Sequence, residues 1–147
     1  MLRPNRAAAA YHPGCFHQPR SLSVIDHLSL GSTRFPAAVA FYRAVLAPLG
    51  LALVRESPQE AAFGRGDDWC FFLYPAEGAP PVTGQRMHVA FRAPSRAAVA
   101  AAHRAALDAQ GHDLFTPRPR PDISDSYFGA MFADLDGHRV EVLTHAA

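Results

Sequence analysis

Hydrophobic and polar positions along this chain follow two different periods, and the same succession of periods occurs twice. Apolar residues at helical spacing predict helices over residues 36–48 and 95–109, with Pro36 near the start of the first and Ser95 as the N-cap of the second. Alternating or short apolar runs predict strands. These strands span residues 24–30, 51–56, 60–65 and 69–74, then 86–92, 112–116, 127–134 and 138–144. The pattern predicts an α+β chain of two units, each a strand, a helix and three strands.

The two units are also similar in sequence. When the chain is laid on itself so that His27 meets His88, the residues around them align as short apolar strands, and the helices that follow stay in register. Gly50 then meets Gly111, and both fall where a helix ends and a residue tolerant of left-handed backbone is favoured. We therefore expect a tandem internal repeat.

Three polar residues occupy apolar strands at corresponding places. His27 and His88 lie in the first strand of their units, and Glu141 lies in the last strand of the chain. Because side chains alternate between the two faces of a strand, all three oppose the apolar residues that would pack under the helices. Their side chains would meet if the two half-sheets curl around a common cleft. His138 is close in sequence but has the opposite parity, so we do not expect it to join them.

The chemistry of these three side chains is that of a metal site. Two neutral imidazoles and a carboxylate give a divalent ion three firm ligands and leave positions open for water or substrate. Taken singly, a strand histidine or glutamate is more often an ordinary hydrogen-bonded or solvated residue. Their joint occurrence in a repeated unit favours metal binding, and the ligand types restrict the ion to iron, manganese, zinc, nickel or cobalt.

Composition restricts the classes of molecule that the chain is expected to bind. With 147 residues the chain has the size of one domain, and its net charge of +1 disfavours nucleic acid or an anionic membrane as a partner. No apolar run reaches the roughly 18 residues of a membrane span. Cys15 and Cys70 match no metal-binding or redox spacing, which is typical of a reducing compartment. We expect a cytoplasmic protein that acts on small molecules.

The beginning of the chain differs from the rest. Residues 1–22 contain no acidic residue, and their apolar run is too short for the core of a signal peptide. We interpret them as a flexible N-terminal arm. Residues 23–147 then form one domain, with modules of about 23–76 and 85–145.

Several segments resemble a known family: IDHLSL with AFYRAVLAPLGL, MHVAF with PSRAAVAAAH, and FADLDGHRVEVL. Over about residues 23–145 the chain resembles the vicinal-oxygen-chelate superfamily of glyoxalases, bleomycin resistance proteins and extradiol dioxygenases. The resemblance implies two tandem βαβββ modules that form a curled mixed sheet around a metal cleft, with the helices on the outer face. It also implies His27, His88 and Glu141 as metal ligands, and a homodimer.

One departure from the family pattern is informative. Relatives of glyoxalase I carry a fourth ligand at the symmetry mate of Glu141, and aligning Leu73 with Leu143 places Phe71 there. Phenylalanine cannot bind an ion, which argues against a lactoylglutathione lyase. The remaining ligand set is similar to that of extradiol dioxygenases, which use iron(II), and of fosfomycin-resistance thiol transferases, which use manganese.

The resulting hypothesis is a metal-dependent enzyme of lyase, dioxygenase or thiol-transferase type that acts on a small molecule with vicinal oxygens. Glu141 and Tyr127 are the candidate catalytic residues, although Tyr127 fits a plain sheet aromatic equally well. The candidate substrate-binding residues are Phe71, Trp69, Phe128 and Arg118. For the aromatic residues the alternative is the core, and for Arg118 it is a solvated loop.

The alternative function is a metal-free protein that sequesters a drug-like molecule, as bleomycin resistance proteins do. Such binders generally lack the full set of three ligands, so the presence of His27, His88 and Glu141 argues against this alternative.

Overall fold

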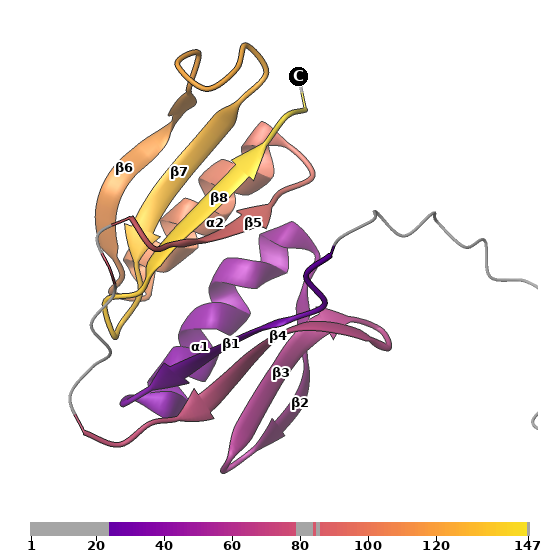
Figure 1. Ribbon diagram of the computed structural model, residues 1–147, viewed down its shortest axis with the longest axis vertical. Coiled ribbons are helices and arrows are strands. Elements are labelled where there is room, and N and C mark those ends of the chain that lie inside the picture. The colour runs from indigo at the N-terminus through magenta and orange to yellow at the C-terminus, as the bar shows by residue number, and fades with distance from the viewer. Residues whose placement is uncertain (1–23, 79–83, 85, 147) are drawn as a thin grey trace, which may run out of the picture.

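The computed structural model describes residues 24–78, 84 and 86–146, so the prediction for residues 1–22 lies outside the described residues. Figure 1 shows two modules of like order. The first contains β1 (Leu28–Ser32), α1 (Phe35–Leu46), the 3-10 turn η1 (Ala47–Leu49), β2 (Ala52–Ser57), β3 (Glu60–Arg65) and β4 (Asp68–Pro75). The second contains β5 (Val89–Arg92), α2 (Arg96–Asp108), β6 (His112–Pro119), β7 (Phe128–Ala133) and β8 (Arg139–Thr144). This confirms the predicted α+β fold of two tandem strand-helix-strand-strand-strand modules.

The helix ends follow from local chemistry. Ser95 caps α2, because its hydroxyl oxygen accepts a hydrogen bond from the Ala98 amide at 3.2 Å. Gly50 ends η1 with φ at 76°, as expected for a left-handed position. At the end of α2, however, the left-handed residue is Gln110, with φ at 70°. Gly111 serves close packing instead, since a Cβ there would lie 2.8 Å from the Ala106 carbonyl oxygen.

The strands form two separate four-stranded mixed sheets, with strand orders β1-β4-β3-β2 and β5-β8-β7-β6. In both sheets the first strand pairs in parallel with the last, and the other pairs are antiparallel. β1 and β5 are therefore edge strands, and no ladder joins the two sheets within the described residues. The predicted strands over 24–30 and 86–92 begin later than expected, so that His27 and His88 each lie directly before a strand.

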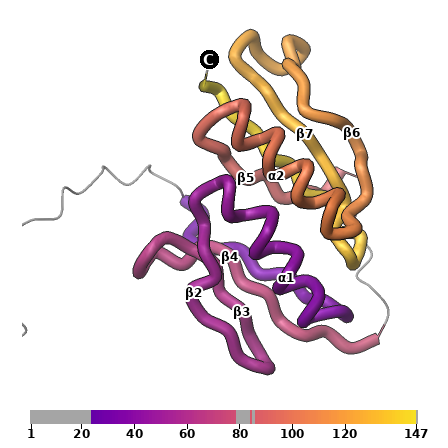
Figure 2. Tube along the Cα trace, turned by 180° about the vertical axis from the view of Figure 1, so that it is seen from behind, coloured from indigo at the N-terminus to yellow at the C-terminus, as the bar shows by residue number. Residues whose placement is uncertain are grey.

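Both modules share one hydrophobic core. Figure 2 shows α1 and α2 side by side, and the rings of Phe41 in α1 and Phe132 in β7 lie 6.0 Å apart across the two modules. The rings of Phe71 in β4 and Phe91 in β5 lie 5.4 Å apart. Each sheet thus packs one face on the helical layer and turns the other face away from it. No helix of the described residues is long and apolar enough to cross a membrane.

Candidate functional site

Glu141 is the centre of a polar cluster on the face of the second sheet that opposes the core. Its neighbours Val140 and Val142 are completely buried in the core, and by alternation the Glu141 side chain projects the other way. One carboxylate oxygen, Oε1, accepts a hydrogen bond from the Tyr127 hydroxyl at 2.9 Å, and Oε2 lies 3.2 Å from Nε2 of His88. Only 5% of Glu141 is exposed. The structure therefore brings together three of the residues predicted for the site.

Tyr127 is a hydrogen-bond donor in this cluster. Burial, and then the hydrogen bond to Glu141 and the charge of that residue, raise the pKa of Tyr127 to about 12, although the charge of Arg120 partly opposes the shift. The phenol consequently keeps its proton at neutral pH. It orients the Glu141 carboxylate and cannot serve as a base there.

His88 presents a lone pair to that carboxylate. Its Nδ1 lies 3.0 Å from the carbonyl oxygen of Arg86, which can only accept, so Nδ1 carries the hydrogen. In the neutral ring Nε2 is then an acceptor, and it faces Oε2 of Glu141, which is also an acceptor. Two converging lone pairs require a cation between them, either a proton or a metal ion. Two ligand atoms that each lie ~2.1 Å from a metal and at right angles are about 3 Å apart, so the observed separation fits a shared ion.

His27 has a similar arrangement on the first module. Its Nδ1 lies 2.8 Å from Oδ1 of Asp26, which fixes Nε2 as the nitrogen with the lone pair. The ring meets Phe72 edge to face at 5.3 Å, and the side chain is 53% exposed. His27 and His88 both line an open cavity of about 380 Å³ between the beginnings of β1 and β5, where Cys70 is a further lining residue. Burial raises the pKa of the Cys70 thiol, so this residue is not a ready thiolate.

The ligand atoms of His27, His88 and Glu141 do not all lie within 4.8 Å of one another in one chain, although His27 and His88 line the same cavity. Among the described residues, the only group of three or more histidine, cysteine or acidic ligand atoms within 4.8 Å of one another is formed by Asp134, Asp136 and His138. A single copy of the chain thus assembles two of the three predicted metal ligands.

The symmetry mate of Glu141 is Phe72, and the prediction of Phe71 is wrong by one residue. In the parallel ladders, Glu141 pairs with Ala90 and Phe72 pairs with Ser29, and these partners are equivalent in the repeat. Phe71 corresponds to Val140 and is completely buried, with its ring 4.8 Å from that of Tyr42. The conclusion that a phenylalanine stands where a fourth ligand would be is unchanged.

The other predicted substrate-binding residues do not lie together on one sheet face. Phe128 packs against the core, with the guanidinium of Arg96 5.3 Å above its ring, so it does not share the face of Glu141. Trp69 lies at the β3–β4 hairpin and donates a hydrogen bond to the Gly66 carbonyl oxygen at 3.2 Å. Arg118 lies on the Glu141 face, because it pairs with Gly129 of β7, where an added Cβ would lie 3.3 Å from Oε1 of Glu141.

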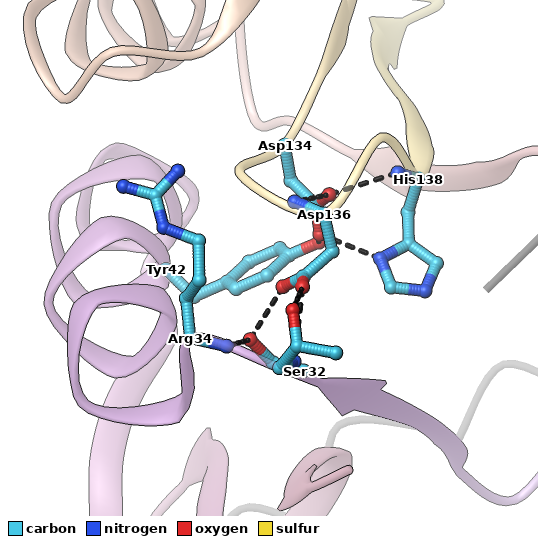
Figure 3. A network of polar contacts seen from close by, with 7 residues as sticks. Ser32, Arg34, Tyr42, Asp134, Asp136 and His138 are labelled. Carbon is cyan, nitrogen blue, oxygen red and sulfur yellow. Dashed lines mark hydrogen bonds and ion pairs between the residues drawn. The ribbon is translucent and has the colours of Figure 1, made fainter. Parts of the chain in front are cut away.

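Asp136 belongs to a second polar cluster, which joins the β7–β8 turn to the start of α1 (Figure 3). Its carboxylate accepts hydrogen bonds from the Ser32 hydroxyl, the Thr33 hydroxyl at 2.7 Å and the Thr33 amide at 2.9 Å. Burial alone would raise the pKa of Asp136, but these hydrogen bonds from Ser32 and Thr33, with the charge of His138, hold it below its ordinary value.

Asp134 completes this inter-module cluster. It accepts hydrogen bonds from the Tyr42 hydroxyl at 2.7 Å, from Nδ1 of His138 at 2.9 Å, and from the amides of Asp136 and His138. The hydrogen bond to Asp134 raises the pKa of His138 despite its burial, and burial followed by the charge of Asp134 raises that of Tyr42. The carboxylate oxygens of both aspartates are thus already used by protein donors, which identifies a structural tie between the modules.

Asp134 and Asp136 lie in the short turn between β7 and β8, and the sequence analysis did not single them out as functional residues. The two aspartates are ordinary turn formers, and nothing in the local pattern indicates partners about a hundred positions away at Ser32 and Thr33. His138 was correctly kept apart from Glu141, since it faces this tie.

Comparisons with known proteins agree with the fold. The family model described as the Glyoxalase/Bleomycin resistance protein/Dioxygenase superfamily matches residues 24–142. No curated protein sequence matches the chain. Among solved structures, a glyoxalase/bleomycin resistance protein from Albidiferax ferrireducens is similar at a TM-score of 0.73 and 22% identity, covering 83% of this chain and 99% of that one.

Two further solved structures carry more specific names. Lactoylglutathione lyase from Agrobacterium tumefaciens has a TM-score of 0.57 and 23% identity, covering 83% of this chain and 93% of its own. A mutant of the fosfomycin resistance protein FosX from Listeria monocytogenes, solved with Mn(II) and 1S,2S-dihydroxypropylphosphonic acid, has a TM-score of 0.60 and 18% identity, covering 83% and 90%. At these identities the likeness concerns the fold alone.

Proposed function

Because the chain belongs to the Glyoxalase/Bleomycin resistance protein/Dioxygenase superfamily, we propose that it is a divalent-metal-dependent enzyme acting on a small molecule with vicinal oxygens. The proposed ligands are His88, Glu141 and His27. The observation that carries the proposal is the 3.2 Å approach of His88 Nε2 to Glu141 Oε2, with Nδ1 of His88 committed to a carbonyl oxygen, which leaves a lone pair on Nε2 of the neutral ring. Second-sphere contacts of this kind orient imidazole ligands in metal sites.

His27 reaches the site, in this proposal, from a second copy of the chain. β1 and β5 are edge strands of separate sheets, and a histidine directly precedes each of them. Unpaired edges associate readily with another strand. Pairing β1 of one copy beside β5 of the other would form the curled cleft between copies and place His27 opposite His88 and Glu141. Exposed apolar side chains beside these edges, Val24 and Met87, suit such an interface. A twofold homodimer would contain two equivalent sites.

When bound, the ion would act as a Lewis acid toward the substrate oxygens and stabilise negative charge that develops on one of them. The residues of the chain have separate tasks. Tyr127 donates its hydrogen bond to Glu141 and so fixes the orientation of the carboxylate. Phe72 occupies the place of a fourth ligand, which leaves the proposed set at three and argues against the lactoylglutathione lyase reaction. Lyase, dioxygenase and thiol-transferase reactions on other substrates, with iron, manganese, zinc, nickel or cobalt, remain the candidates. A cytoplasmic location also stays a prediction.

The first test is metal content. Purified protein is dialysed against Mn(II), and bound metal is measured by mass spectrometry for the wild type and for His88→Ala, Glu141→Gln and the control His112→Ala, which alters an exposed histidine at the start of β6. We expect about one equivalent per chain in the wild type and the control, and at least a tenfold loss of affinity in the other two variants. A folded, metal-free wild type that binds a drug-like ligand would favour the metal-free binding protein instead.

The second test asks whether the site is shared between copies. His27→Ala and His88→Ala proteins are each expected to lose metal. If they are mixed, unfolded and refolded together, a heterodimer with shared sites contains one site with both substitutions and one with neither. Metal binding should then return at one ion per heterodimer. A mixture that stays metal-free, while wild-type protein treated in the same way recovers, would contradict the shared site and place all three ligands in one chain.

A further inference from the structure

Tyr127 and His145 lie opposite each other just beyond the end of the β7–β8 ladder. The last pair of that ladder joins Phe128 to Thr144. One step further along the same antiparallel register, Tyr127 lies opposite His145, and directly opposite residues share a sheet face. His145 also follows Glu141 by four residues, so alternation continued from β8 gives it the face of Glu141. The two rings pack edge to face on this side, with their centres 5.2 Å apart and their planes at 90°.

The backbone of Tyr127 is held by the loop before it. Its carbonyl oxygen accepts a hydrogen bond from the Arg120 amide at 2.8 Å, and its amide donates to the Ser124 carbonyl oxygen at 3.0 Å. These hydrogen bonds fix the backbone but do not determine the direction of the side chain. Gly129 provides the space for that side chain, since a Cβ there would lie 3.2 Å from the Tyr127 ring. The ring can therefore lean along the strand over Gly129 and bring its hydroxyl to Glu141.

His145 is exposed to solvent, but its ring is held by two further contacts. The Ser126 hydroxyl and Nδ1 of His145 form a hydrogen bond of 3.3 Å. The backbone around His145 is anchored as well, because the Ala146 amide donates a hydrogen bond of 3.1 Å to the hydroxyl oxygen of Thr144, a residue that is only 2% exposed. The imidazole thus has a defined position against the Tyr127 ring.

We propose that His145 is a positioning residue of the site at Glu141, and that it acts through Tyr127. Its ring holds the Tyr127 ring over Gly129, so the phenol keeps its hydrogen bond of 2.9 Å to Oε1 of the carboxylate. The other oxygen, Oε2, then stays directed at Nε2 of His88, 3.2 Å away. This inference rests on the proposed function for the role of Glu141 as a metal ligand. Contacts outside the ligands orient them in metal sites, so loss of the His145 ring should weaken metal binding.

The first test is a double-mutant cycle on the Mn(II) affinity of the full chain, measured by competition with a chelator. His145→Ala should weaken binding about 2- to 10-fold, the range that an edge-to-face ring pair contributes. His145→Phe keeps a ring and should retain most of the affinity, whereas His145→Gln can still bond to Ser126 but has no ring and should behave like His145→Ala. In a Tyr127→Phe background, which already lacks the hydroxyl, His145→Ala should change the affinity less than about twofold. An equal loss in both backgrounds, or full affinity in His145→Gln, would contradict the inference.

The second test needs no metal. In nuclear magnetic resonance spectra of the metal-free protein, the Tyr127 ring protons should show nuclear Overhauser effects to the α protons of Gly129, because the ring lies directly over that residue. These effects should weaken in His145→Ala and persist in His145→Phe and in the control His112→Ala, an exposed histidine of β6. Undiminished effects in His145→Ala would overturn the inference. If the wild type takes up no Mn(II) but its Overhauser effects depend on His145, the proposed function fails and the positioning contact stands.

Discussion

The substitution Asp136→Asn tests whether the inter-module tie stabilises the fold. Asp136 is 6% exposed and accepts three hydrogen bonds, two from hydroxyls and one from the Thr33 amide. An asparagine keeps the size but loses the charge, and its amide group presents hydrogens to donors. Hydrogen bonds to a charged group contribute ~1.5–3 kcal/mol each and are not additive, so we expect the free energy of unfolding to fall by about 2–3 kcal/mol.

The direction in which this loss of stability depends on pH follows from the pKa of Asp136. The pKa of Asp136 is lower in the folded protein than the ordinary value of 3.8. The ionised carboxylate therefore contributes stability that is complete above the unfolded pKa and is lost as the pH falls through the folded pKa. The difference between wild type and Asp136→Asn should be largest near pH 5 and should shrink below about pH 4. It should also decline as the pH rises through the titration of His138, because the charge of Asp136 helps to raise the pKa of that histidine.

The assay is urea unfolding followed by circular dichroism at one protein concentration, so that association does not alter the comparison. Asp125→Asn, an exposed loop aspartate, is the matched control and should lie within about 0.5 kcal/mol of the wild type. A loss below that limit for Asp136→Asn, or a difference that persists undiminished at pH 3, would refute the reasoning.

Three other predictions concern separate parts of the molecule. Gly111→Ala should destabilise the fold by about 1–3 kcal/mol in the same assay, because its Cβ would lie 2.8 Å from a helix carbonyl oxygen. By nuclear magnetic resonance, the pKa of the His138 ring should lie above the ordinary value of 6.5, and Asp134→Asn should return it toward 6.5. The stability that His138 contributes should be complete below pH 6.5 and should be lost as the pH rises through the raised pKa. Tyr127→Phe should weaken metal binding about tenfold, measured by competition with a chelator, since Glu141 loses its orienting donor.

The face of each strand could be predicted from the sequence with good accuracy where buried and polar residues alternate strictly. In β8, Val140 and Val142 enter the core and Glu141 opposes them, as their alternation predicts. In β4 the run Phe71-Phe72-Leu73 is apolar on both parities, so composition alone could not decide which phenylalanine faces the core. A slip of one residue moves a side chain to the other face, and only the ladder with β1 settles the register.

Distances between the modules could not be predicted from the repeat. The repeat relates each strand of one module to its counterpart, but it contains no information on how the two sheets are placed. That placement follows from the shared core, where the helices meet, and from the tie between Asp136 and the end of β1. Partners this distant in sequence leave no periodic signal, because they depend on the packing of whole elements and not on spacing along one of them.

The contrast between the two polar clusters shows why proximity alone is a poor guide to a metal site. Asp134, Asp136 and His138 lie closest together, yet hydrogen-bond donors of the protein already occupy the carboxylate oxygens of both aspartates. An ion would have to displace these donors and leave them buried without partners, at a cost of about 1–3 kcal/mol for each. At Glu141 the balance differs, since Oε2 faces Nε2 of His88 at 3.2 Å, and a metal ion there would replace only a proton between these two atoms and leave the Tyr127 hydrogen bond to Oε1 intact. A metal ion should therefore bind where lone pairs converge without donors.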